Sequence, residues 1–183
     1  MRKVTLAELK QIALQSKSSL WAAARSVGQD VKLYLHWTAG HYGQFFSDYH
    51  INIDHDGSVY VSTNNLAELK YHTWHRNTGA IGIALACAYQ ANTNNLGPEP
   101  PTVQQIEAMA QVVAVLAEVL DLTIDKQRVM THFEAALIDG YGPGSGDPET
   151  RWDLWFLPGV VKGEGGNVLR GKANWYRNYG IGG

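Results

Sequence analysis

The sequence of 183 residues has only one cysteine, Cys87, and no excess of basic residues. A single thiol cannot form a disulfide within the chain, so stability does not depend on an oxidising compartment. Lysine and arginine together number 15 against 17 aspartates and glutamates, and the net charge is -2 at pH 7. This balance differs from the basic surface of nucleic-acid-binding proteins, so we expect no nucleic acid among the partners.

Long apolar segments are also lacking. No stretch has the roughly 18 consecutive apolar residues of a transmembrane helix, so we expect no membrane span. The first residues, MRKVTLAELKQ, have a basic start without the apolar core of a secretory signal. Hydrophobic residues nevertheless make up 45% of the chain, an ordinary globular composition. Length and composition together predict one domain that spans residues 1–183.

Three segments have the periodicity and the boundary signals of helices. The first begins with a capping box at Thr5–Glu8 and continues until Gly28. The second begins at Thr102, and the third is expected at about residues 167–179, packed on the rest of the domain. The second helix is expected to bury the apolar stripe of Val103, Ile106, Ala110, Val113, Leu116 and Leu120.

Five short segments have the composition of strands, and one of them is a continuous apolar run at residues 80–88. The others are residues 32–36, the hairpin 49–54 and 58–62, and residues 128–131. The order of helix, strands, helix, strand and helix predicts an α/β fold of mixed, α+β-like character. We expect a single central mixed β-sheet flanked by helices on both faces.

Two of the seven histidines have the same sequence context. His36 and His132 each follow a short strand and precede a loop with small residues, which is a rigid way to present a ligand. Two neutral imidazoles and one carboxylate form the three-ligand pattern of a catalytic zinc site. Asp147 and Asp153 both follow His132, and spacing alone does not choose between them. The alternative for His36 is that it only caps a strand.

Several pieces of the sequence, taken in order, resemble the zinc N-acetylmuramoyl-L-alanine amidases. This family includes the amidase-type phage lysozymes and the peptidoglycan recognition proteins. The pieces lie within residues 33–153 and are HWTAG from His36, Tyr49-His50 leading to DGSVY from Asp56, His72 with Asn77 and IGI from Ile81, and THFE from Thr131. Each piece is short, and their common order makes the resemblance specific.

The resemblance implies that His36 and His132 bind Zn²⁺ and that Tyr49 helps to orient water or stabilise an oxyanion. In such enzymes the third ligand often lies two residues after a lysine that stabilises the transition state. Arg151 and Asp153 have this spacing, with arginine in place of lysine, so Asp153 is the expected ligand and Arg151 the oxyanion stabiliser. Some members carry a glutamate where this chain has Ala84, so the resemblance is closer to members that rely on the tyrosine.

The surroundings of the two aspartates also favour Asp153. It precedes the apolar residues 154–156, which can anchor its backbone in the core, whereas Asp147 lies among the glycines and prolines of residues 142–148. The resemblance further predicts that Trp37, Asn77 and His72 contact substrate, although His72 has the alternative role of capping a loop. Glu134 or another acceptor is expected to fix the tautomer of a ligand histidine.

The implied function is zinc-dependent hydrolysis of the amide bond between N-acetylmuramic acid and L-alanine in peptidoglycan or in muropeptides. A second class of function stays open, because non-catalytic relatives bind muropeptide without cutting it and typically lack the third ligand. An available acid with a cation two residues before it favours the enzyme. Without a secretory signal, we expect synthesis in a bacterial or phage-infected cytoplasm and release to the wall through a holin or secretion system.

Overall fold

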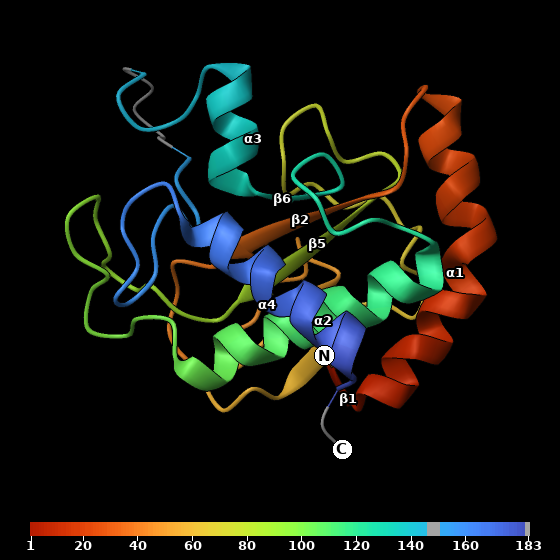
Figure 1. Ribbon diagram of the computed structural model, residues 1–183, viewed down its shortest axis with the longest axis horizontal. Coiled ribbons are helices and arrows are strands. Elements are labelled where there is room, and N and C mark those ends of the chain that lie inside the picture. Colours follow the sequence, from red (N-terminus) through yellow and green to blue (C-terminus); the bar gives the residue numbers. More distant parts are fainter. Residues whose placement is uncertain (146–150, 182–183) are drawn as a thin grey trace.

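A computed structural model describes residues 1–145 and 151–181 (Figure 1). Four helices and six strands form within these residues, and both long helices begin at the predicted capping boxes, at Thr5 and Thr102. The helices are α1 (Leu6–Ser26), α2 (Val103–Leu120), α3 (His132–Asp139) and α4 (Gly165–Tyr179). The strands are β1 (Arg2–Val4), β2 (Lys32–Trp37), β3 (Ile51–Ile53), β4 (Val59–Val61), β5 (Ala80–Leu85) and β6 (Val129–Thr131).

The strands form one mixed sheet in the order β1-β4-β3-β5-β2-β6. β3, β5, β2 and β6 run parallel to one another, whereas β4 pairs antiparallel with β3 and with β1. The carboxyl ends of the four parallel strands therefore meet at one edge of the sheet, where ligand sites of open α/β sheets usually lie. This arrangement confirms the predicted α/β class and the central mixed sheet.

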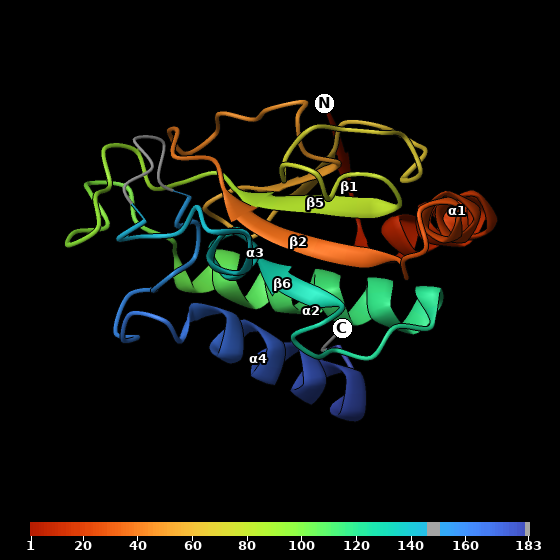
Figure 2. The same cartoon turned by 90° about the horizontal axis from the view of Figure 1, so that it is seen from above.

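One face of the sheet carries most of the core. Figure 2 shows α2 beneath this face and α4 beneath α2. Leu33, Leu35 and Trp37 of β2 point into this core and are almost completely buried. α2 is the one helix in the described part of the chain that is long and apolar enough to cross a membrane, and 67% of that window is buried inside the fold. Core helices of globular proteins share this character.

The opposite face of the sheet carries the alternate residues of β2, namely Lys32, Tyr34 and His36. Tyr34 packs there in a small cluster with Met130 of β6 and Ala135 of α3. Residues 62–79 form an irregular segment that also reaches this face, since a Cβ on Gly82 would meet the ring of His72. Helices thus lie on both faces, as predicted, but α3 covers only the β6 side of this one.

Three details differ from the sequence-based expectations. β1 and α3 were not predicted, because β1 has only three residues and α3 begins directly where β6 ends. Val103, expected in the buried stripe of α2, has 72% of its surface exposed. It occupies the first position of the helix, and its side chain faces solvent there.

Candidate metal site

His36 lies near the carboxyl end of β2 and is fully buried. β2 is flanked by β5 and β6, so its backbone is held by hydrogen bonds on both sides. The neighbouring position on β5 is Ala84, so β5 offers no carboxylate beside His36. A ligand held in a central strand keeps its direction, because the strand cannot move without breaking both ladders.

His132 is the first residue of α3, directly after β6. Thr131 caps this helix through its side chain, and Glu134 completes the capping box by accepting a hydrogen bond from the backbone amide of Thr131. The capping box satisfies free amide groups of the first turn and fixes the angle at which the chain enters the helix. His132 is therefore presented from a rigid strand-to-helix junction.

Asp153 lies in a turn that is anchored in the core. Its carbonyl oxygen accepts a hydrogen bond from the amide of Phe133, which ties the turn to the start of α3. Leu154 is fully buried, although its φ of +63° is unusual for a residue with a side chain. Trp152, the residue before Asp153, packs edge-on against Trp37 with 5.1 Å between ring centroids. Of residues 154–156, which the sequence predicted as the anchor, Leu154 is buried and residues 155 and 156 are half-buried. The competing candidate, Asp147, lies outside the described residues.

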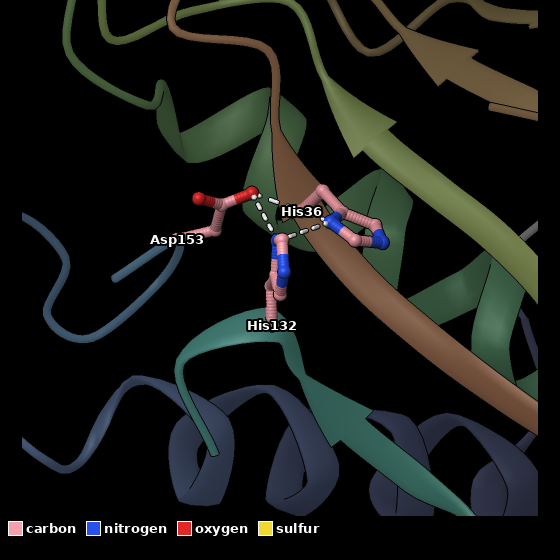
Figure 3. Close-up of side chains that lie close together, drawn as sticks. All are labelled: His36, His132 and Asp153. Carbon is pink, nitrogen blue, oxygen red and sulfur yellow. Dashed lines mark hydrogen bonds and ion pairs between the residues drawn. The ribbon is translucent and has the colours of Figure 1, made fainter. Parts of the chain in front are cut away.

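The three side chains converge on one point, as Figure 3 shows. Nδ1 of His36 lies 3.2 Å from Nδ1 of His132, and Oδ2 of Asp153 lies 3.3 Å from each of these nitrogens. A tetrahedral zinc ion with bonds of about 2.0–2.1 Å needs its ligand atoms about 3.3–3.4 Å apart. The three donor atoms therefore have the spacing and the chemistry that suit Zn²⁺.

The protonation states of these groups also suit a metal. Burial lowers the pKa of His36 to about 4, although the hydrogen bond with Asp153 opposes the shift. Burial raises the pKa of Asp153, but the charge of His132 and the hydrogen bonds with both histidines outweigh it and bring the pKa below its usual range. At neutral pH His36 is thus neutral and Asp153 is ionised, which are the forms that bind metal ions.

Tyr49 and Arg151 are the two residues predicted to act on the substrate beside the metal. The ring of Tyr49 is 5.0 Å from that of His36 between centroids. Burial raises the pKa of the Tyr49 hydroxyl, and the charge of Asp153 adds to the shift, so this hydroxyl keeps its proton at neutral pH. The guanidinium of Arg151 lies over the ring of Tyr141, 4.8 Å from its centroid. Arg151 and His132 line the same cavity, whose volume is about 1030 Å³.

The other ring nitrogen of His36 points away from the cluster, toward residues 72 and 73. Its Nε2 lies 3.2 Å from Nδ1 of His72 and 3.3 Å from Oγ1 of Thr73. Asn77 accepts hydrogen bonds from the backbone amides of both His72 and Thr73 and so shapes this segment. Of the three residues predicted to contact substrate, Trp37 lies in the core. Asn77 and His72 both line the cavity, and His72 also contacts His36. Their contact with substrate stays a prediction.

Comparison with known protein families gives one match. The family model of N-acetylmuramoyl-L-alanine amidase matches residues 19–150, which is well over half of the chain. The chain belongs to the N-acetylmuramoyl-L-alanine amidase family. The match includes His36, Tyr49 and His132, and it ends before Asp153. The third member of the cluster and the whole of α4 thus lie beyond the matched segment.

Two solved amidase structures from Clostridium intestinale URNW are similar to this chain. One is the N-acetylmuramoyl-L-alanine amidase LysC, which is 18% identical with a TM-score of 0.40, over 56% of this chain and 69% of LysC. The other is the endolysine N-acetylmuramoyl-L-alanine amidase LysCS, also 18% identical, with a TM-score of 0.41, over 56% of this chain and 68% of LysCS. No curated protein matches the chain significantly. Membership of the amidase family therefore rests on the match over residues 19–150.

In this member of the amidase family, two contacts around the cluster were not foreseen from the sequence. Thr73 was not singled out, because a threonine in an irregular segment carries no signal of its own. Glu134 is not the acceptor for a ligand histidine, since its carboxylate pairs with Arg170 of α4 and with the amide of Thr131. The pattern Thr131-His132-Phe133-Glu134 is a capping box, and this reading would have indicated α3 and the structural role of Glu134.

Proposed function

We propose that this protein hydrolyses the amide bond between the lactyl group of N-acetylmuramic acid and L-alanine in peptidoglycan, with Zn²⁺ held by His36, His132 and Asp153. The observation that carries the proposal is the triangle of three donor atoms, 3.2–3.3 Å on each side, in a chain of the amidase family. Two imidazoles and one carboxylate form a ligand set found in catalytic zinc sites. When bound there, zinc supplies a Lewis acid and a water that ionises near pH 7.

The residues around the metal site have separate tasks in this proposal. Tyr49 donates its hydroxyl proton in a hydrogen bond to the oxyanion that develops on the substrate carbonyl, and the raised pKa of Tyr49 keeps that proton available. Arg151 contributes a permanent positive charge to the cavity that His132 also lines. Ala84 offers no carboxylate beside His36, so Tyr49 takes a larger share of the work.

The cavity beside His132 gives the substrate its place. It runs from His132 and Arg151 past Trp74 and Arg76 to Lys32, near the amino end of β2. Aromatic side chains lie in this groove together with cations and with the carboxylates of Asp30 and Asp139, and Asp139 pairs with Arg76. Such a lining suits a ligand with apolar stems and charged groups, such as the peptide of a muropeptide. The groove thus supports a substrate that extends away from the metal site on the side of residues 69–78.

A muropeptide-binding protein without catalysis is the second candidate, because the same groove serves recognition alone. The presence of a complete three-donor set favours the enzyme, since a protein that only binds needs no third ligand. The experiment is product analysis of purified peptidoglycan by mass spectrometry. Cleavage of the proposed bond yields free amino groups on L-alanine and no new reducing sugar ends, and Asp153→Asn abolishes it. Binding of peptidoglycan without any such product would identify a binding module.

A further inference from the structure

The two nitrogens of the His36 ring face different surroundings. Nδ1 faces His132 and Asp153, whereas Nε2 lies within 3.3 Å of both Nδ1 of His72 and Oγ1 of Thr73. A neutral imidazole carries one proton, and a nitrogen that binds a metal must be the one without it. His36 therefore serves as a metal ligand through Nδ1 only if Nε2 carries the proton and finds an acceptor.

The acceptor is provided on the side of residues 72 and 73. Nε2–H of His36 can donate to Nδ1 of His72 directly, or it can donate to Oγ1 of Thr73. The hydroxyl of Thr73 lies 3.0 Å from Nδ1 of His72, so it can pass a second hydrogen bond to the same nitrogen. In both arrangements the last hydrogen bond is accepted by the lone pair of Nδ1 of His72. The proton of the His72 ring is then on its Nε2. The tautomers of His36 and His72 therefore depend on each other, and both rings carry the proton on Nε2.

Several contacts with the backbone fix the position of the His72 ring. The ring lies against the backbone of Gly82 in β5, and a Cβ at this position would be 2.7 Å from its Cγ and Cδ2. The backbone amides of residues 72 and 73 both donate to the side chain of Asn77. Only 9% of the surface of His72 is exposed. Within the described residues, its Nε2 is the one fully buried side-chain polar atom without a hydrogen-bond partner.

Keeping this polar atom buried without a partner costs free energy, so a purpose for the placement is expected. We propose that His72 is a positioning residue for the metal site: its Nδ1 is the acceptor that fixes His36 as the Nε2–H tautomer and leaves Nδ1 of His36 bare toward His132 and Asp153. This inference rests on the proposed function, because it assumes that these three residues hold zinc. It gives His72 a role in addition to, and independent of, contact with substrate.

The test compares zinc affinity among matched variants of the full chain, by competition with a chromophoric chelator and with zinc as the only ligand. His72→Phe fills the space above Gly82 without an acceptor, and zinc affinity is expected to fall roughly 10–100-fold, as for other partners of ligand histidines. His72→Asn returns an acceptor near the position of Nδ1 and is expected to recover most of the affinity. His75→Asn, at an exposed histidine of the same segment, is the control and leaves affinity unchanged.

A second variant displaces His72 without altering its chemistry. Gly82→Ala introduces a Cβ into the ring's position, so zinc affinity is expected to fall in the same direction as in His72→Phe. Thermal unfolding of each variant shows that it is folded. In the zinc-loaded wild type, ¹⁵N-edited NMR should show the Nε2 proton of His36 as a slowly exchanging signal, and this signal should shift in His72→Phe and return toward its position in His72→Asn.

The outcomes separate the two proposals. Wild-type protein that binds no zinc would overturn the proposed function itself. Wild-type protein that binds zinc, together with a folded His72→Phe of equal affinity, would overturn the role of His72 alone. A large loss in Thr73→Val with no loss in His72→Phe would assign the acceptor to Thr73 and also contradict the inference. Equal losses in His72→Phe and His72→Asn would show that packing matters here and not the acceptor, which contradicts it as well.

Discussion

Arg170 and Glu134 form a buried ion pair that joins the C-terminal helix to the metal site. Nη2 of Arg170 lies 2.7 Å from Oε2 of Glu134, and the side chains are only 7% and 5% exposed. Nη1 of Arg170 also donates to Oε1 of Glu134 and to the carbonyl of Val129 in β6. Because the same carboxylate accepts from the amide of Thr131, this pair holds the junction that presents His132. α4 therefore supports the site from a position beyond the family match.

Removal of Arg170 should destabilise the protein strongly. Arg170→Leu leaves the Glu134 carboxylate buried without its partner, and loss of one member of a buried ion pair typically costs about 3–5 kcal/mol. Denaturant unfolding measures this change. Lys172→Leu on the same helix is the matched control, because Lys172 and Glu107 are about one third exposed and such pairs contribute less than about 1 kcal/mol. Similar losses in both variants would contradict the structural role of Arg170.

The same pair predicts a loss of stability in acid. Burial raises the pKa of Glu134, but the hydrogen bonds and charge of Arg170 outweigh it, so the pKa lies below its ordinary value of 4.5. A group with a lowered pKa in the folded state stabilises it above the unfolded pKa, and this contribution disappears as pH falls. Unfolding free energy measured below about pH 4.5 should therefore fall more steeply in the wild type than in the double variant Glu134→Gln/Arg170→Leu. Parallel curves would show that the pair has no such effect.

Tyr49→Phe should retain the fold and the metal but lose most of the activity. The phenylalanine keeps the ring beside His36 and removes only the hydroxyl. Loss of one oxyanion donor typically lowers kcat by about 10²–10³. Turnover of soluble muropeptide, zinc stoichiometry and thermal unfolding are the three measurements. A variant as fast as the wild type would leave Tyr49 with a packing role only.

Asp153→Ala and Asp147→Ala should differ in metal content. Asp153 provides one corner of the donor triangle, and two histidines alone hold zinc weakly. We expect zinc occupancy to fall sharply in Asp153→Ala and to persist in Asp147→Ala. Elemental analysis of both variants, purified side by side, decides the matter. Zinc retained in Asp153→Ala but lost in Asp147→Ala would reverse the assignment and remove the basis for Arg151 as well.

Much of the fold could be predicted because its signals are local. Capping boxes at Thr5 and Thr102 mark the starts of α1 and α2, and the apolar run that begins at Ala80 is the central strand β5. The places of His36 and His132 followed from strands that end at the same sheet edge. β1 was missed because three residues at the N-terminus form a strand only through pairing with β4.

The surroundings of the metal site could not be predicted to the same extent. His72 comes near His36 because an irregular segment folds back over Gly82. The course of an irregular segment leaves no periodic pattern in the sequence, so this contact could not be predicted. Arg170 and Glu134 are 36 residues apart in the sequence, and the packing of α4 brings them into contact. Both contacts depend on tertiary structure, whereas strand ends and helix caps depend on neighbours in the sequence.

The most direct test of zinc-dependent amidase activity is a zinc titration of metal-free protein. Chelated and dialysed protein is mixed with increasing zinc, and the release of L-alanine amino groups from purified peptidoglycan is measured at each step. The donor set of His36, His132 and Asp153 predicts no hydrolysis without metal and a rise that reaches its plateau at one zinc per chain. Full hydrolysis by thoroughly metal-free protein would contradict the account.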